Sequence, residues 1–424
     1  MRIMVLGGGG CQLNLLRRLR EQNDEIILVD YLYDCPGRTY ADIHLPISTF
    51  DTLAVIRAAR KYAVEGIVTT GTDQPVMTAA ATAELLGLPF YIDSPTALAV
   101  TNKRVMKELF TRNGIPTLPY RLLSADFLDS EIKGFPFPAV LKPVDSQGQR
   151  GVFRVEGPAG VRSRIRDTLS YSREERALLE AYYENDEITV NGWADEGRAT
   201  VLSVVDRVTM ARGEHIGICL CHHFPSVHMR TYRDSIYQVT ESIVSALGIR
   251  SGPLYFQYLI GRQGIMVNEI AMRIGGAYED ITLPIITGLD PLGMLIDYVK
   301  TGTCDAAGLR RYSLQDNRKF VSTQLFFCHP GRVARITPVG RIKSLPRVHD
   351  AYFAVREGDI ISPIEDATAR AGYFIVEGDS FAEMIERVNH VYSRMEVRDP
   401  QERDLLIRYE DYLDKYRFYT DRLD

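Results

Sequence analysis

The clearest alternation of apolar and polar positions lies past the middle of the chain. Two apolar, aromatic runs, residues 254–260 and 265–270, flank a Gly-Arg-Gln-Gly turn, and this pattern predicts a β-hairpin. The alternation sends Gln257 to one face of the first strand. Glu269 lies on the otherwise apolar second strand, and Arg273 lies beyond its end. An amide, an acid and a base are therefore expected to converge where a buried sheet normally carries none.

Burying these groups without partners would cost several kcal/mol, so something must compensate. Oxygen ligands from Glu and Gln suit Mg²⁺, which takes the rest of its shell from water and substrate phosphates. An arginine four residues beyond Glu269 would then steady the phosphate charge. The alternative on this stretch alone is a buried ion pair between Glu269 and Arg273 that ties the hairpin to its neighbour.

Strands and helices alternate in the first hundred residues. A short apolar strand at 2–6 runs into four glycines, Gly7–Gly10, and leucines then recur at helical spacing. This opening resembles a dinucleotide fingerprint only weakly, because it lacks a clean G-x-G-x-x-G. The expected elements that follow are a strand at 25–30, a helix at 52–62, a strand at 66–70, a helix at 75–86 and a strand at 89–92. The pattern predicts an alternating α/β domain, in which the glycine turn either binds a ligand or is only a turn.

A helix over 94–113 carries Lys103, and a strand at 139–142 ends in Lys142. The loop 145–151 that follows is rich in small residues and returns to a strand. Glycines let main-chain N–H groups approach phosphate oxygens, and a lysine at the strand end is placed to hold them. Without that lysine, the loop would be interpreted as an ordinary turn.

The apolar stretch 177–183 brings an acid and two aromatic residues together. Glu180 and Tyr182 lie in it, and Glu187 opens the next strand. Adenine needs apolar walls and main-chain hydrogen bonds, while ribose hydroxyls need a carboxylate. An ordinary strand pair with two solvent-facing acids explains the same pattern equally well.

The rest of the chain carries fewer chemical signals. Residues 215–228 hold four histidines and two cysteines, but their spacing does not match a zinc knuckle, so a strand and loop lining a site is the better interpretation. The other expected elements are a strand at 200–210, helices at 235–247, 284–288, 291–301 and 380–394, strands at 320–327, 332–336, 351–355 and 372–377, and a charged helix at 401–423.

Composition sets the limits of these interpretations. A chain of 424 residues is long enough for about three domains. The net charge of −5 gives no basic footprint for nucleic acid, and no apolar run reaches about 18 residues, so no membrane span is expected. Six scattered cysteines form no disulfide framework, and a reducing cytoplasm is the expected location.

Taken together, the order of these parts resembles the ATP-grasp superfamily of carboxylate–amine ligases over residues 1–395. Within it, the chain is most similar to the branch of carbamoyl-phosphate synthetase, biotin carboxylase and the L-amino acid ligases. The residues that carry the resemblance are Lys103, Lys142 with its glycine-rich loop, Glu180, Glu187, Gln257, Glu269 and Arg273. Their order and spacing are specific, although no single motif is.

The resemblance implies a multidomain α/β and α+β fold. Its expected parts are a Rossmann-like N-terminal preATP-grasp domain (1–95), connecting helices (96–117), a lid (118–195) and a central subdomain with the metal site (196–312) that form the two-part ATP-grasp domain, and a small β-rich C-terminal domain with terminal helices (313–424).

The resemblance also implies roles, residue by residue. Lys103 and Lys142 match the lysines that hold ATP phosphates, and Arg273 with Lys142 matches the catalytic groups at the transferring phosphoryl. The remaining matches are Ser146, Gln147, Gly148 and Gly151 in the loop that closes over the nucleotide, Glu180 and Tyr182 at the adenine hinge, Glu187 at the ribose, and Gln257 and Glu269 as ligands of Mg²⁺ or Mn²⁺. Substrate specificity is expected from His215, His222, His223 and Glu279.

The implied activity is an ATP-dependent ligase. It would activate a small carboxylate, such as an amino acid, as an acyl phosphate and join it to an amine, releasing ADP and phosphate. Its partners would be small molecules, with no nucleic acid or membrane, and a homodimer is compatible. One departure matters: the branch usually has E-x-N-x-R, and Ala271 stands at the Asn position. A non-catalytic nucleotide-binding protein therefore stays open, as does, more remotely, an NAD-dependent oxidoreductase that uses the N-terminal glycine turn.

Overall fold

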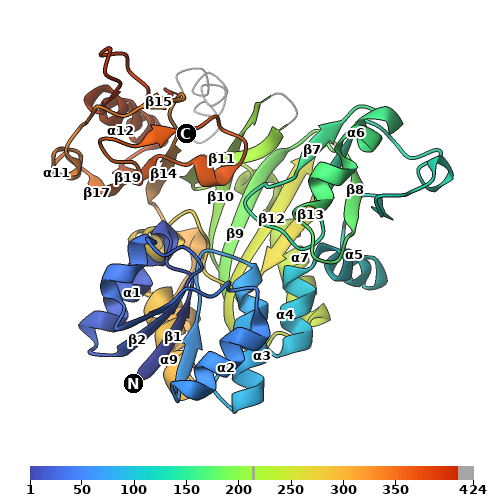
Figure 1. Ribbon diagram of the computed structural model, residues 1–424, viewed down its shortest axis with the longest axis horizontal. Helices are drawn as coiled ribbons and strands as arrows, with labels where there is room; N and C mark the ends of the chain where they lie inside the picture. The colour runs from blue at the N-terminus through green and yellow to red at the C-terminus, as the bar shows by residue number, and fades with distance from the viewer. Residues whose placement is uncertain (213–214, 409–424) are drawn as a thin grey trace.

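The described residues form three larger sheets and two sheets of two strands each. The structure is a computed structural model, and it describes residues 1–212 and 215–408. Figure 1 shows the N-terminal domain in blue, the lid in green, the central strands in green and yellow, and the C-terminal part in orange and red. The multidomain α/β and α+β fold expected from the sequence is confirmed.

The N-terminal sheet is parallel and has the order β3-β2-β1-β4. Its elements are β1 (Arg2–Leu6), η1 (Gly10–Gln12), α1 (Leu13–Glu21), β2 (Glu25–Val29), η2 (Pro36–Tyr40), β3 (Ile43–Leu45), α2 (Thr52–Lys61), β4 (Gly66–Val68) and α3 (Gln74–Leu86). The strand expected at 89–92 is wrong. Tyr91 stacks on Phe90 and donates its hydroxyl hydrogen to Met272 O, so this segment is tied to the β-hairpin and not to the sheet.

The single helix expected over 94–113 is also wrong, because two helices meet at Asn102. The helices are α4 (Ser94–Thr101) and α5 (Lys103–Arg112). Asn102 is extended, and its side-chain oxygen accepts from the N–H groups of Arg104 and Val105. Asparagine is a strong N-cap, so it ends one helix and starts the next. Lys103 thus lies in the first turn of α5.

A second sheet, called the lid here after the prediction for residues 118–195, is antiparallel, has the order β5-β8-β6-β7 and carries one helix. Residues 186–195, which were expected in the lid, instead form a strand of the central sheet. Its elements are β5 (Tyr120–Leu123), η3 (Asp129–Glu131), β6 (Ala139–Pro143), β7 (Phe153–Val155), α6 (Pro158–Leu169) and β8 (Ala177–Ala181). The expected glycine-rich connection between two strands is confirmed, since β6 and β7 are paired on either side of it.

An eight-stranded antiparallel sheet runs through the centre, in the order β13-β12-β9-β10-β11-β14-β19-β17. Its central strands and flanking helices are β9 (Asp186–Asp195), β10 (Arg198–Arg212), β11 (His215–Phe224), α7 (Met229–Ala246), β12 (Gly252–Gly261), β13 (Gly264–Ala271), α8 (Glu279–Thr287) and α9 (Pro291–Thr301). The predicted hairpin is confirmed as β12 and β13. Helix α8 begins five residues before its expected start and contains Pro284.

The C-terminal part continues this sheet, because β14 pairs with β11. Its elements are α10 (Ala307–Arg311), η4 (Leu314–Asp316), β14 (Phe320–Phe326), β15 (Gly331–Arg332), β16 (Arg335–Ile336), α11 (Val339–Lys343), β17 (Val348–Phe353), β18 (Ile360–Ile361), η5 (Ala367–Ala369), β19 (Gly372–Gly378), α12 (Phe381–Arg394) and β20 (Val397–Arg398). The strand expected at 332–336 is two short strands with different partners.

The charged helix expected at 401–423 does not form over its described part. Leu406 makes a bridge with Cys328, and Asp404 makes one with Arg398. The rest of that prediction, residues 409–423, lies outside the described residues.

The N-terminal domain is packed closely onto the central part. Helix α9 lies against the N-terminal sheet, where a Cβ on Gly66 would come within 2.9 Å of Val299 O. Buried side chains of both parts form one continuous hydrophobic core. Within residues 1–212 and 215–408, no helix is both long enough and apolar enough to cross a membrane.

Candidate active site

The hairpin places Gln257 and Glu269 side by side. The two residues are direct cross-strand partners in β12 and β13, so their side chains share one face. Glu269 Oε1 lies 2.9 Å from Lys103 Nζ, which also donates to Ser146 O at 2.9 Å. Hairpin, helix α5 and lid loop therefore meet at one lysine. The sequence predicted all four positions, and the structure brings them together.

The charges of this pair depend on each other. Burial disfavours the ionised Glu269 carboxyl, but the Lys103 ammonium outweighs it, so the pKa of Glu269 lies below its ordinary value. Burial likewise disfavours the Lys103 ammonium, and Glu269 outweighs this to raise the pKa of Lys103. Both groups are therefore charged at neutral pH.

A second cluster forms around Glu180, which is only 2% exposed. Its Oε2 accepts from Lys142 Nζ at 2.6 Å, and its Oε1 lies 2.5 Å from Lys107 Nζ. Lys107 is fully buried and also donates to Thr117 Oγ1 and Val267 O. Burial opposes ionisation of Glu180, but the two ammonium groups outweigh it and lower its pKa. Glu180 thus holds the strand-end lysine in place.

Lys107 was missed by sequence reasoning. Its signal was its spacing, since it follows Lys103 by four residues and lies on the same face of a helix. Burial lowers the pKa of Lys107, an effect that the Glu180 carboxylate only partly offsets.

Arg273 is held by the N-terminal domain. Its Nε and Nη2 lie 2.7 and 2.6 Å from Asp73 Oδ1, and its guanidinium carbon lies 4.1 Å from the centre of the Tyr255 ring. Burial raises the pKa of Asp73, although Arg273 opposes this effect. Asp73 was also missed, because an aspartate just before a Gln-Pro helix start is typical of a plain N-cap.

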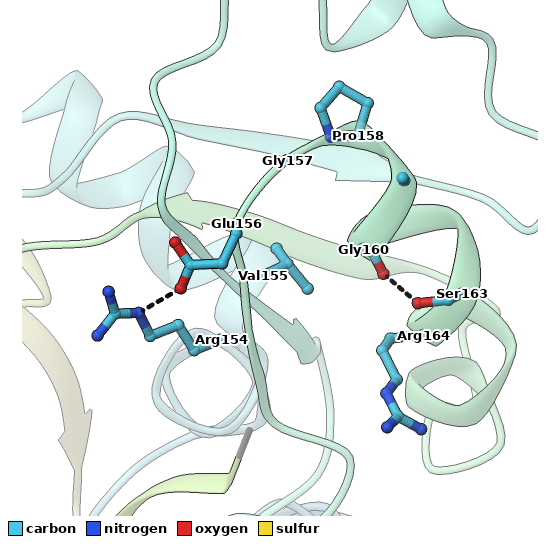
Figure 2. A pocket seen from close by; sticks show the side chains of 9 residues that line it. Arg154, Val155, Glu156, Gly157, Pro158, Gly160, Ser163 and Arg164 are labelled. Atoms are coloured by element: carbon cyan, nitrogen blue, oxygen red, sulfur yellow. Dashed lines mark hydrogen bonds and ion pairs between the residues drawn. The ribbon is translucent and has the colours of Figure 1, made fainter. Parts of the chain in front are cut away.

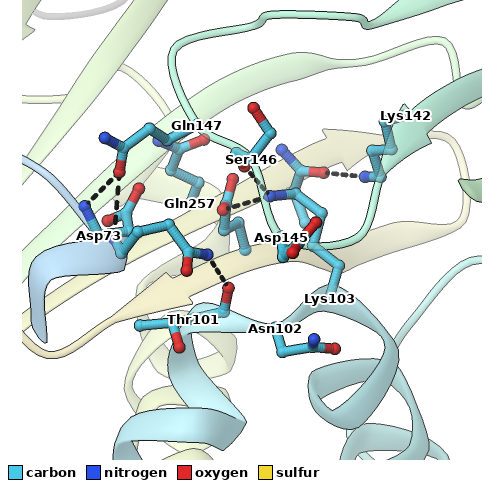
Figure 3. Close-up of polar contacts among 12 residues, drawn as sticks. Asp73, Thr101, Asn102, Lys103, Lys142, Asp145, Ser146, Gln147 and Gln257 are labelled. Atoms are coloured by element: carbon cyan, nitrogen blue, oxygen red, sulfur yellow. Dashed lines mark hydrogen bonds and ion pairs between the residues drawn. The ribbon is translucent and has the colours of Figure 1, made fainter. Parts of the chain in front are cut away.

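The lid loop is held from two sides. Gln147 Oε1 accepts from the main-chain N–H groups of Asp73 and Gln74 at 2.7 and 3.1 Å, as Figure 3 shows. Gly148 O accepts from Ala367 N of the C-terminal part at 3.0 Å. Gly148 has φ of +71°, a conformation that glycine adopts freely.

The same loop ends at Gly151, which has φ of +69°. A Cβ there would come within 2.7 Å of the Tyr171 ring. Thus the N-terminal domain, the lid and the C-terminal part all meet at this loop.

The residues expected at the nucleoside lie at the junction of lid and central sheet. Glu187 forms an ion pair with Arg207 at the start of β9. Tyr182 is 36% exposed, and the Arg154 guanidinium lies 4.5 Å from the centre of its ring. The side chain of Glu180 faces the two lysines, so a contact with adenine would fall to the neighbouring main chain.

A pocket of about 420 Å³ lies on the lid near Arg154. Its lining is confined to residues 154–164, and Figure 2 shows the Arg154–Glu156 ion pair and the Ser163–Gly160 hydrogen bond at its edges. None of the lysines or carboxylates described above lines this pocket, so it is separate from the charged cluster.

Two of the four residues expected to set specificity form a buried cluster. His222 Nδ1 lies 3.2 Å from Glu279 Oε1. Burial would lower the pKa of His222, but the nearby Cys219 and Glu279 raise it to about 9. Glu279 Oε2 also accepts from Ala277 N, so it holds the loop that follows Arg273.

The other two specificity residues do not join this cluster. His223 is buried on β11 beside Phe381, and the His215 side chain lies outside the described part of the chain.

The donor set of the hairpin fits Mg²⁺. Gln257 Oε1 is buried and makes no hydrogen bond within the described residues, although its Nε2 donates to Tyr255 at 3.3 Å. A buried carbonyl oxygen beside the Glu269 carboxylate is the ligand type that this ion prefers. Ala271 offers no side-chain oxygen, and the side-chain amide oxygen of Asn268 lies 3.3 Å from Lys142 Nζ.

Comparisons with known proteins agree with this fold. A family model described as the ATP-grasp domain matches residues 135–280, and one described as L-amino acid ligase C-terminal domain 2 matches residues 324–398. An L-amino acid ligase from Bacillus licheniformis has a similar structure, with a TM-score of 0.78 and 17% identity over 94% of this chain and 99% of that one.

Two curated relatives differ in how much of their length is matched. Dapdiamide A synthase of Enterobacter agglomerans is 22% identical over 75% of this chain and 76% of its own. The D-alanine–D-alanine ligase of Geobacter sulfurreducens is 28% identical, but over 31% of this chain and only 45% of its own. The two family models and the fold shared with the L-amino acid ligase agree, so this chain contains an ATP-grasp domain followed by an L-amino acid ligase C-terminal domain 2.

Proposed function

We propose that this protein is an ATP-dependent ligase that activates a small carboxylate, such as an amino acid, as an acyl phosphate and joins it to an amine. One observation carries the proposal: Lys103, Glu269 and the main chain of the lid loop meet at one point, with Arg273 and Lys142 in the adjoining pairs. Such a cluster suits a phosphoryl group that is transferred between two oxygens, where positioning and charge neutralisation supply the catalysis.

The residues divide the work by position. Lys103 of helix α5 and Lys142 of the lid strand β6 would hold phosphate oxygens, and Arg273 would face the transferring phosphoryl group. Gln257 and Glu269 would hold Mg²⁺, which when bound neutralises part of the developing charge. The lid loop would exclude water, which otherwise hydrolyses an acyl phosphate.

The proposed reaction has two steps. The substrate carboxylate oxygen bonds to the γ-phosphorus as the bond to ADP breaks. The neutral amine then bonds to the acyl carbon, the C–O bond to the phosphoryl group breaks, and inorganic phosphate leaves with the proton that the nitrogen loses. The L-amino acid ligase match in the C-terminal part supports an amino acid as the carboxylate.

The test is phosphate release over pairs of amino acids with ATP and Mg²⁺. At least one pair should give ADP and phosphate together with a dipeptide detected by mass spectrometry. Glu269→Ala should lower this rate at least a hundredfold, while the control Glu386→Ala, at an exposed site on α12, should leave it unchanged. Turnover of Glu269→Ala near the wild-type rate would exclude the metal assignment.

A second candidate, nucleotide binding without catalysis, is favoured by one observation. With Gln257 and Ala271 in place, Glu269 is the single carboxylate that the hairpin offers to a cation. Tight ATP binding by calorimetry, with no phosphate release on any pair, would support this candidate over the ligase.

A further inference from the structure

Helix α3 is capped by a residue of the lid. The first N–H groups of a helix need acceptors outside it. Pro75 has no N–H, and Val76 N donates to Asp73 O at 3.0 Å. The N–H groups of Asp73 and Gln74 both donate to Gln147 Oε1, at 2.7 and 3.1 Å (Figure 3). The lid thus supplies the acceptor that α3 lacks.

The residue expected to cap α3 is Asp73 itself, because aspartate is among the strongest N-caps. Its side chain makes no capping hydrogen bond, and its backbone lies in the helical region. Its Oδ1 instead receives two N–H groups of Arg273, at 2.7 and 2.6 Å. Gln147 therefore fixes the main chain of the same residue whose side chain holds Arg273.

We propose that Gln147 is a positioning residue: by fixing the main chain at Asp73 and Gln74, it keeps the Asp73 carboxylate where it holds Arg273 toward the cluster around Glu269. This inference rests on the proposed function in so far as Arg273 serves the phosphoryl group. It assigns to the lid loop a task besides covering that group.

A consequence follows for motion of the loop. When the loop moves away from α3, the N–H groups of Asp73 and Gln74 lose their acceptor, and the main chain at Asp73 is no longer fixed. The Asp73 carboxylate then no longer holds Arg273 in one position. The arginine is therefore held in place only while the loop lies over the site, and chemistry is confined to that position of the lid.

The capping half is tested by amide hydrogen exchange of the full chain. Gln147→Ala should raise exchange at the Asp73 and Gln74 amides about tenfold, the size of one lost cap interaction. The control Gln149→Ala, in the same loop with its amide against Gly217, should leave both amides unchanged. Equal protection of these amides in Gln147→Ala and wild type would overturn the proposal.

The positioning half is tested by a double-mutant cycle. Gln147→Ala should lower kcat about tenfold in the wild-type background, with a smaller change in KM for ATP. In the Asp73→Ala background no carboxylate is left for Gln147 to position, so the same substitution should change kcat less than twofold. Equal losses in both backgrounds would contradict the route through Asp73.

The two experiments allow the role of Gln147 and the ligase activity to fail independently. Hydrogen exchange needs no turnover. A wild-type protein that releases no phosphate on any amino acid pair would count against the ligase, and the exchange result would still decide whether the lid caps α3.

Discussion

Asp280 offers the sharpest test of the electrostatics around the site. It lies in the first turn of α8, directly after Glu279, and is 4% exposed. Its Oδ1 makes no hydrogen bond within the described residues. Burial raises the pKa of Asp280 to about 7, although a hydrogen bond with the Asn14 side chain opposes this. The isosteric substitution Asp280→Asn removes the titration and keeps the shape.

The direction in which stability changes with pH follows from comparing the ionisation of Asp280 in the folded and unfolded chains. Below about pH 4 the carboxyl is protonated in both, so its ionisation adds nothing. Between pH 4 and 7 the unfolded chain ionises while the folded one keeps its proton, so stability falls as pH rises. From the ordinary value of 3.8 to about 7 the difference is about 3 pKa units, or on the order of 4 kcal/mol once pH exceeds 7.

The expected result is a substitution whose effect depends on pH. In urea unfolding followed by circular dichroism, Asp280→Asn should match wild type near pH 4 and become the more stable protein by about 2–4 kcal/mol at pH 8. Asp34→Asn is the control, since that side chain is 93% exposed. A stability difference for Asp280→Asn that stays constant from pH 4 to 8 would refute the reasoning.

Two further substitutions test packing and charge. Lys107→Met leaves Glu180 with one ammonium partner, so the free energy of unfolding measured by thermal denaturation should fall by about 3 kcal/mol. ATP should also bind about tenfold more weakly in calorimetry. The control Lys133→Met, at an exposed position, should change neither quantity. Gly276→Ala places a Cβ 2.4 Å from Gly71 O, so limited proteolysis should cut the N-terminal domain faster; wild-type resistance would contradict this contact.

Local pattern predicted much of the site. The β12–β13 hairpin follows from alternation and a glycine turn, which act over a few residues. Lys142 and the loop after it were found for the same reason, because a strand end and a glycine-rich return are local features. Resemblance to a family then connected segments that no local rule relates.

The sequence could not show which residues become partners only after the chain has folded. Asp73 and Arg273 lie 200 residues apart, one just before α3 and the other just after β13. Gln147 reaches α3 across a domain boundary, and no periodicity in either segment indicates that contact. The break at Asn102, by contrast, could have been predicted, since asparagine before a charged helical turn is a typical N-cap.

The pairing of charges within the cluster bears on how a polyphosphate would bind. Its four cations and three carboxylates are Lys103 with Glu269, Lys107 and Lys142 with Glu180, and Arg273 with Asp73. Every cation is already satisfied by the chain, so binding an anion requires an exchange of partners, and separating a buried pair is costly. Under the proposed function, a divalent cation at Glu269 would replace Lys103 there and free that ammonium for phosphate. Metal and nucleotide should therefore bind cooperatively, because each supplies the partner that the other displaces.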